Sequence, residues 1–309
     1  MGPNGQDITP YIGYSCFPLL LIFPAALYVP VFNYLVSLAV VFAVIFLAVN
    51  KMNVLLTVGL IGSFGILLLI HGFMPWVMSF WAMTTVPAAV FGKTMNIGMT
   101  PRKAFFIGAI IATIFSLLFF LVIREPLYES IDAMSGWIGT MLGTLDTSES
   151  LRADLADNFK NMFEITKRLS PAFMVLNGIG LLFVGWLILK IMMDMLHKFH
   201  PGMGSFIYWK MPQVYIYITG LFILMRLVGP EVLQAMADNV LLFLGFFYAV
   251  FGFAVMEYYL KKIRLSLFLK VLFYIGIVFL QLPGLLLAAL IGIFDSYFDF
   301  RKVRARIIG

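Results

Sequence analysis

Four polar side chains lie within long apolar stretches of the sequence and are the first candidates for chemistry. Arg226 and Glu257 are ionisable, and an ionisable group at membrane depth is a functional candidate because burying it is costly. Asn177 and Gln281 are uncharged and have similar surroundings. These four are our candidate substrate-binding residues. The alternative is that Arg226 and Glu257 extend to the membrane surface and that the two amides hydrogen-bond neighbouring helices.

Two carboxylates near the end of the chain, Asp295 and Asp299, lie four residues apart and share one face of a helix. Such a pair could bind a cation or relay protons. It could equally neutralise basic side chains at the cytoplasmic interface, and the pattern favours this structural role. The basic residues available for that role are Lys261, Lys262, Arg264 and Arg301.

The sequence contains no enzyme signature. It lacks the GxSxG, HExxH and Walker A patterns and has no GxGxxG that opens a helix after a strand. Cysteine and histidine do not cluster at the spacing of metal ligands. We therefore expect a protein that is not an enzyme, with no catalytic residue, no metal and no cofactor.

The composition is that of a membrane protein. Of 309 residues, 62% are hydrophobic and 12% are charged, about half the charged share of a soluble domain, and the mean hydropathy is +1.00. The alternating pattern of a transmembrane barrel is absent. The net charge of +6 fits basic cytoplasmic loops, so we expect no nucleic-acid partner. The predicted fold class is an all-α polytopic transmembrane helical bundle of about 8–10 segments.

Prolines and polar turns divide the chain into spans. Pro24 and Pro30 interrupt the apolar stretch 12–49, and proline disfavours helix at the preceding residue. We predict two spans there, 12–29 and 31–49, with one kinked helix as the alternative. Further spans are predicted at residues 54–70, 76–91, 104–123, 171–191, 213–228 and 239–259, with a short acidic loop at 229–238.

Residues 124–169 form the only sizeable polar region. Apolar residues recur at helical spacing in its second half, 150–169, so an amphipathic insert is predicted. Such a helix between two spans rests on the membrane surface, which we favour, or covers a cavity. The predicted domains are an N-terminal membrane bundle at 1–123, an extracytoplasmic amphipathic helical insert at 124–169, and a C-terminal membrane bundle with a basic tail at 170–309.

Basic residues fall in alternate loops, and this predicts the orientation. Lys51 and the basic groups within 93–103, 190–210 and 261–264 lie on one side, which the positive-inside rule makes cytoplasmic. The N-terminus is then inside and the insert outside. The basic tail at 301–306 must also lie inside. We therefore predict that 265–299 is a hairpin broken at Pro283 and Gly284, rather than one long span.

The end of the chain resembles a known family. The stretch GIFDSYFDFRK at residues 292–302, with Asp295, Asp299 and Arg301, is similar to the closing signature of the YybS-like family of bacterial membrane proteins. The stretch WKMP, from Trp209 to Pro212, resembles that family's entry into its later helices. The resemblance implies a multi-pass protein of the bacterial cytoplasmic (inner) membrane with no established biochemical activity. The cytoplasmic position of both termini is predicted from the basic loops alone.

A looser similarity links the front helices to the substrate-binding subunits of energy-coupling-factor vitamin transporters. In those six-helix proteins, small residues at four-residue spacing dock the coupling subunit, and Ala39 and Ala43 have this spacing. The insert and the extra C-terminal segments depart from the six-helix pattern.

Two functions from different classes remain open. The first is transport, in which the bundle binds a small solute and works with a partner membrane coupling subunit. The second is a non-transporting membrane scaffold for envelope assembly, division or sporulation, with the insert and the basic tail as its contact surfaces. The lipid bilayer is a partner in both hypotheses. The scaffold also requires an envelope protein, and the transporter requires a small-molecule ligand, which the sequence does not identify.

Overall fold

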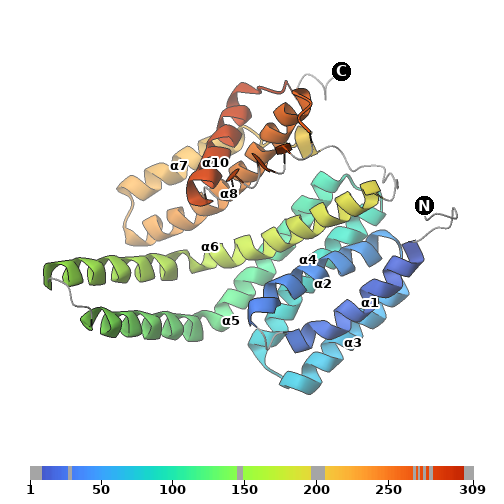
Figure 1. Cartoon of the computed structure of the whole chain (residues 1–309), viewed down its shortest axis with the longest axis horizontal. Helices are drawn as coiled ribbons and strands as arrows, with labels where there is room; N and C mark the ends of the chain where they lie inside the picture. The colour runs from blue at the N-terminus through green and yellow to red at the C-terminus, as the bar shows by residue number, and fades with distance from the viewer. Residues whose placement is uncertain are drawn as a thin grey trace. The chain divides into compact units, whose positions relative to one another are not determined.

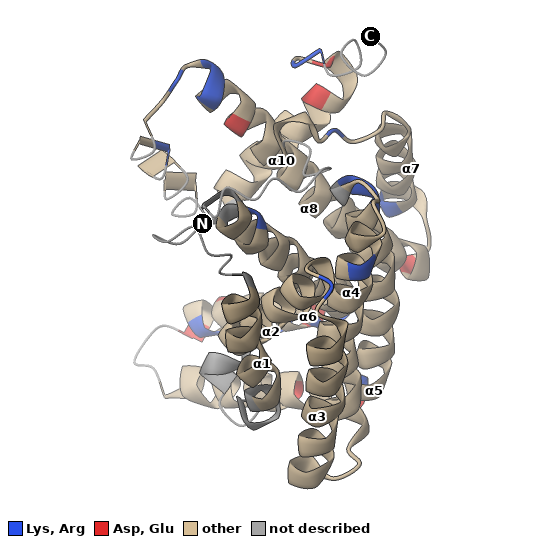
Figure 2. Cartoon of the chain, turned by 90° about the vertical axis from the view of Figure 1, so that its right-hand side faces the viewer, with Lys and Arg blue, Asp and Glu red and all other residues tan. Residues whose placement is uncertain are grey.

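We describe the protein from a computed structural model that covers residues 9–26, 30–144, 149–195, 206–266, 269–270, 272–273, 276–277 and 281–302. The described residues form nine α-helices and one short 3₁₀ helix, and they include no strand. Four of these helices are long and apolar enough to cross a membrane, and shorter apolar helices accompany them. Figure 2 shows long stretches of helix without a charged residue. The predicted all-α membrane bundle is therefore confirmed.

The chain divides into two compact units, Met1–Met203 (unit 1) and Gly204–Gly309 (unit 2). This division differs from the domains that the sequence suggested, because the predicted boundaries at 123/124 and 169/170 fall inside two continuous helices. Each unit is described by itself below.

In unit 1, α2 (Pro30–Val49) forms the centre. It contacts α1 (Thr9–Ala26), α3 (Asn53–His71) and α4 (Pro75–Asn96), and the residues from Ala43 to Val49 are all buried. Because α1 and α2 are separate helices packed against each other, the prediction of two spans in this region is confirmed and a single kinked helix is excluded. The turn between the two spans, which the prolines predict near residues 29–33, is wrong for residues 30–33, because α2 already begins at Pro30; residue 29 lies outside the described residues.

The insert is not a separate surface helix. α5 (Pro101–Gly143) and α6 (Glu149–Met195) are single helices of 43 and 47 residues that contain both the apolar spans and the polar insert. They pack against each other and form a long antiparallel hairpin (Figure 1). Pro126 and Pro171 lie inside these helices without ending them. The change from apolar to polar residues predicted boundaries at 123/124 and 169/170. The backbone hydrogen bonds of a helix do not depend on that change, so the helices continue through it.

Unit 2 contains a 3₁₀ turn (Phe206–Tyr208), α7 (Val214–Val228), α8 (Glu231–Lys262) and α10 (Gln281–Phe298). The predicted acidic loop at 229–238 is wrong for most of its length, because α8 already begins at Glu231. Pro230 precedes that helix, and an acidic side chain in the first turn is favourable beside the positive end of the helix dipole.

α8 and α10 are parallel and approach each other closely. Gly252 of α8 lies against the carbonyl of Ala288, and Gly292 of α10 lies against the carbonyl of Tyr248. A Cβ at Gly292 would also lie 3.0 Å from the Gly252 nitrogen, so the two glycines mark the closest approach. Tyr259 and Phe300, further along both helices, are also in contact, and the two contacts together give the helices the same direction. A side chain at either glycine would overlap the backbone of the facing helix.

Parallel packing of α8 and α10 requires that the chain between them runs back. Lys270 lies beside Glu257 of α8, with the ion pair at 3.4 Å, and Ile277 lies against Gly284. The hydroxyl of Tyr259 donates to the carbonyl of Phe300 at 3.4 Å, so the ends of α8 and α10 meet. A single long span at 265–299 is therefore excluded, and the chain turns back as the hairpin prediction requires. The predicted break at Pro283 and Gly284 is wrong, because both residues lie inside α10, which begins at Gln281.

Candidate functional site

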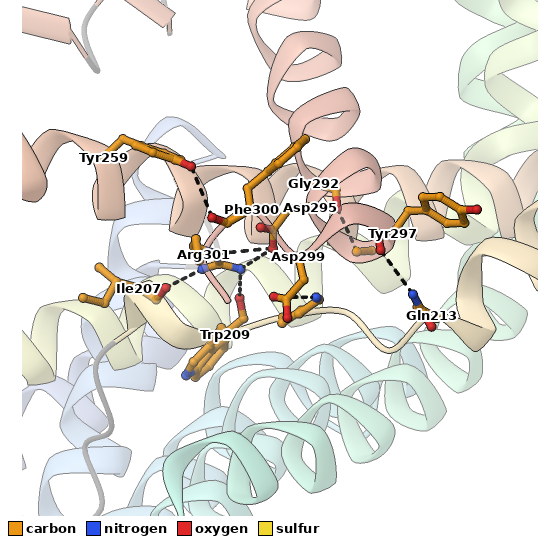
Figure 3. Close-up of polar contacts among 12 residues, drawn as sticks. Ile207, Trp209, Gln213, Tyr259, Gly292, Asp295, Tyr297, Asp299, Phe300 and Arg301 are labelled. Carbon is orange, nitrogen blue, oxygen red and sulfur yellow. Dashed lines mark hydrogen bonds and ion pairs between the residues drawn. The ribbon is translucent and has the colours of Figure 1, made fainter. Parts of the chain in front are cut away.

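The most developed polar site in the described residues lies where α8 and α10 end, and we call its four ionisable side chains the Arg301 cluster: Lys210, Asp295, Asp299 and Arg301. Figure 3 shows Arg301 between the end of α10 and the segment that leads into α7. The side chains of Arg301 and Asp295 are 0% and 2% exposed. Two full charges so deeply buried need compensating partners, and the geometry supplies them.

Arg301 joins three segments of unit 2. Its Nη2 donates to Asp295 Oδ2 at 2.7 Å and to the Trp209 carbonyl at 2.7 Å. Its Nε also donates to Asp295 Oδ2, at 3.3 Å, and its Nη1 donates to the Ile207 carbonyl. The planar fork of the guanidinium suits several acceptors at fixed angles. Arg301 therefore fastens the 3₁₀ turn and the residues after it to the end of α10.

The second ion pair of the cluster joins Lys210 to Asp299, with Nζ and Oδ1 2.7 Å apart. Asp299 follows the last residue of α10 and has a left-handed backbone (φ 53°), which aspartate tolerates better than most residues. Its amide donates to the Asp295 carbonyl at 2.9 Å, and its own carbonyl accepts from Lys302 at 2.8 Å. This turn directs Arg301 back beneath the helix toward Asp295.

The cluster has two cations and two anions, so its charge is balanced. Asp295 Oδ1 is buried and accepts no hydrogen bond from any described residue. All the strong contacts run within the cluster or to backbone carbonyls, as expected for a structural fastening. Arg301 is one of the basic residues that the sequence predicts as partners of the two carboxylates, and it pairs with Asp295. Lys261 instead forms an ion pair with Glu257, with Nζ and Oε1 3.6 Å apart.

The WKMP and GIFDSYFDFRK stretches meet in this site. Trp209 supplies a backbone carbonyl and is buried, whereas Pro212 is exposed beside it. Gln213 donates to the Tyr297 carbonyl at 3.2 Å, a second link between the two stretches. The resemblance pointed to both stretches separately, but it did not predict that they form one site.

Arg226 forms an ion pair beside the turn between α7 and α8. Its Nε lies 2.7 Å from Asp238 Oδ1, and its Nη1 donates to Gln234 Oε1 at 2.9 Å. Gln234 in turn donates to the Gly229 carbonyl at 2.9 Å. Arg226 thus fastens the end of α7 to the first turns of α8. The sequence offered a signal for this contact, because an arginine and an aspartate flank the turn at Pro230.

Glu257 lies near the other end of α8. Its Oε1 is 3.6 Å from Lys261 Nζ and 3.4 Å from Lys270 Nζ. Asp238 and Glu257 are 19 positions apart on one helix, which corresponds to ~28 Å at 1.5 Å per residue. Arg226 is therefore far from Glu257, and the two do not share a binding site.

Of the other two candidate residues, one lies in each unit. Asn177 belongs to α6 of unit 1 and is partly buried. Gln281 begins α10, and its side chain lies outside the described part of the structure. Among the described residues, no three His, Cys, Asp or Glu side chains are arranged to hold a metal ion.

A model of the family described as predicted membrane protein (DUF2232) matches residues 19–296 of the chain. The chain belongs to this family. No curated protein and no solved structure matches it. The matched range includes Trp209, Lys210 and Asp295 and ends at Ser296, so Asp299 and Arg301 lie just beyond it.

Family membership therefore agrees with the membrane fold, but it assigns no activity to the Arg301 cluster. The geometry shows ion pairs and hydrogen bonds that hold residues 207–210, before α7, against the end of α10. The hydrogen bond between Tyr259 and Phe300 joins the end of α8 to the same region.

Proposed function

We propose that this protein is a non-transporting scaffold of the bacterial cytoplasmic membrane, and that the hairpin of α5 and α6 is its docking element for an envelope protein. The observation that carries the proposal is the length of these helices. A 43-residue helix extends ~64 Å at 1.5 Å per residue, about twice the ~30 Å of a bilayer core. The apolar span at 104–123 accounts for one half, so the other half projects from the membrane.

The projecting part is built to stay closed. Tyr128 donates through its hydroxyl to the Lys167 carbonyl at 3.2 Å, and Lys167 Nζ pairs with Asp132. Leu142 of α5 and Phe163 of α6 are buried. The hydrogen bond from Lys167 to Asp132 raises the pKa of Lys167 above its ordinary value of 10.5, so Lys167 stays charged at neutral pH.

The same hairpin leaves apolar side chains uncovered. Met134, Trp137 and Met141 of α5 are exposed, with Trp137 at 63%, and their three- and four-residue spacing places them along one side of the helix. Leu151, Met162 and Ile165 of α6 are also exposed. An exposed apolar surface outside the bilayer is typical of a protein contact site. The partner that fits it presents an apolar helix face.

The positive-inside rule places this hairpin on the extracytoplasmic side. It lies at the far end of α5 from Lys93, Arg102 and Lys103, which lie near the start of that helix. Basic residues favour the cytoplasmic side. The tail resemblance to the YybS-like family supports a bacterial inner membrane, and the basic loops support a cytoplasmic position for both termini.

The experiment is photocrosslinking in the native host. A photoreactive amino acid at Trp137 is expected to capture one defined envelope protein, and the same probe at Glu129, on another face of α5, is expected not to. The triple variant M134Q/W137Q/M141Q is expected to lose the partner, whereas E125Q/E129Q/D157N keeps it. Equal capture from both positions, or retention of the partner by the apolar-face variant, would overturn the proposal.

Transport remains a second candidate on the basis of unit 1. This unit contains six described α-helices, the number found in the energy-coupling-factor subunits that its front helices resemble. Ser116 Oγ is buried without a hydrogen-bond partner among the described residues and lies against Gly178, next to Asn177. These groups give unit 1 polar atoms at the middle of the α5 span.

Two observations weigh against transport. Ala43 is fully buried, so Ala39 and Ala43 do not form an external docking face for a coupling subunit. Arg226 and Glu257 are held in ion pairs at opposite ends of α8. Native mass spectrometry of the gently solubilised protein separates the two functions. A solute retained by the wild type and by S130A, but lost in S116A and N177L, would favour transport.

A further inference from the structure

The ends of α8 and α10 carry three basic side chains that lack an acidic partner. Lys262, Arg264 and Lys302 are exposed, and none forms an ion pair with a carboxylate of the described residues. The nearby acids are already engaged: Glu257 with Lys261 and Lys270, Asp295 with Arg301, and Asp299 with Lys210. This end of unit 2 therefore has a net positive surface beside a neutral, buried ion cluster.

The three cations belong to one region. The hydrogen bond from the Tyr259 hydroxyl to the Phe300 carbonyl brings the two helix ends together, as Figure 3 shows. Lys262 Nζ also lies 5.9 Å from the centre of the Tyr259 ring. Arg264 and Lys302 both follow their helix ends in left-handed backbone conformations, with φ of 56° and 51°. Such conformations are costly for residues other than glycine and often occur at functional sites.

Exposed aromatic rings lie at the end of α10 that leads to Lys302. Phe298 and Phe300 stack with their centres 5.8 Å apart, and Phe294 stacks on Phe298 at 6.3 Å. Tyr297 meets the Phe298 ring edge-on at 4.8 Å. All four rings are about half exposed. Their stacking is ordered although no described residue covers them.

The depth of this surface matches a membrane interface. α10 has 18 residues, which corresponds to ~27 Å at 1.5 Å per residue and nearly equals the ~30 Å hydrocarbon core. Phe294 then lies among the acyl chains near the boundary, while Lys302 and Arg264 lie level with the headgroups. Aromatic rings below and cations above are the arrangement that an anionic phospholipid satisfies.

We propose that this surface, formed by Tyr259, Lys262, Arg264, Phe298, Phe300 and Lys302, binds an anionic phospholipid of the surrounding bilayer. The headgroup phosphate pairs with the three cations, and the acyl chains lie against the aromatic rings. The site is independent of the scaffold function, because it belongs to unit 2 and involves no residue of the α5–α6 hairpin.

The test is native mass spectrometry of the full chain released from nanodiscs that contain either phosphatidylglycerol or phosphatidylcholine. The wild type is expected to retain phosphatidylglycerol in preference to phosphatidylcholine. The variant K262Q/R264Q/K302Q is expected to lose that preference by roughly a hundredfold, since each basic residue contributes about a factor of five at an anionic surface.

The matched control is K51Q/K93Q/K103Q, which removes the same charge from exposed lysines of unit 1 and is expected to bind as the wild type does. Thermal unfolding in detergent checks that both variants fold. Equal retention of the two lipids by the wild type would refute the site. Unchanged preference in K262Q/R264Q/K302Q, or an equal loss in the control, would show that general surface charge is responsible.

Discussion

The Arg301 cluster and the polar part of the α5–α6 hairpin (residues 124–169) differ in the kind of side chain that they bury and expose. In the cluster, charged side chains are buried, and each finds partners within unit 2. In the hairpin, apolar side chains such as Trp137 are exposed. Buried charges that are fully paired stabilise one arrangement of the chain, whereas uncovered apolar groups leave binding energy available to a partner. This difference separates residues that stabilise the protein from residues that we propose as its contact surface.

The largest expected effect is at the centre of the cluster. Arg301→Leu leaves Asp295 buried without its counter-ion and removes two bonds to backbone carbonyls. Loss of one partner of a buried ion pair costs about 3–5 kcal/mol, so a large fall in the thermal unfolding midpoint is expected. Lys302→Gln, at the next and exposed position, is expected to change stability in lipid-free detergent by less than about 0.5 kcal/mol. Similar thermal unfolding midpoints for the two variants would contradict the structural role of the Arg301 cluster.

A smaller loss is expected where α8 and α10 touch. Gly252→Ala places a methyl group on the backbone of Ala288, and overpacking of this kind costs about 1–3 kcal/mol. Gly245→Ala on the same helix meets nothing within 4 Å and is expected to raise stability slightly, because alanine favours helix. The expected result is that the unfolding midpoint falls in Gly252→Ala and rises slightly in Gly245→Ala. A neutral Gly252→Ala would contradict the parallel contact.

Stability and function are expected to separate in the hairpin. Trp137→Gln removes an exposed ring, so the free energy of unfolding is expected to stay within about 0.5 kcal/mol of the wild-type value, although the envelope partner is lost. Pull-down and thermal unfolding of the same preparation check both halves of this statement. A clear loss of stability would mean that Trp137 packs within the protein. The hairpin and the Arg301 cluster would then both be stabilising elements, and the contrast between them would fail.

The smallest effect concerns the charge pair inside the hairpin. Because the folded-state pKa of Lys167 is raised, its contribution is fully present below the ordinary value of 10.5 and is lost as the pH rises through the folded value. The difference in unfolding midpoint between the wild type and Lys167→Met is therefore expected to shrink in strongly alkaline solution. A difference that grows there would contradict the assigned contact with Asp132.

The sequence predicted what depends on local composition. Apolar run length and proline placement gave the separate helices α1 and α2, and charge placement gave the return of the chain before α10. The extent of α5 and α6 was missed, because the polar change after Ile123 was interpreted as a helix boundary. The partners of Asp295 and Asp299 were predicted only in part. Lys210 lies almost ninety residues earlier in the chain than Asp299, and composition carries no information about such distant pairings.

The contacts of Arg301 also have a consequence for biosynthesis. Ile207 and Trp209 are 94 and 92 positions before the arginine that holds them. The ribosome must therefore make α7, α8 and α10 before the entry to α7 can be fastened. Until then Lys210 has no Asp299, and Asp295 has no Arg301. Maturation of unit 2 is thus a late event, and a chain that stops before Arg301 would present unpaired charges to the membrane proteases that remove incomplete products.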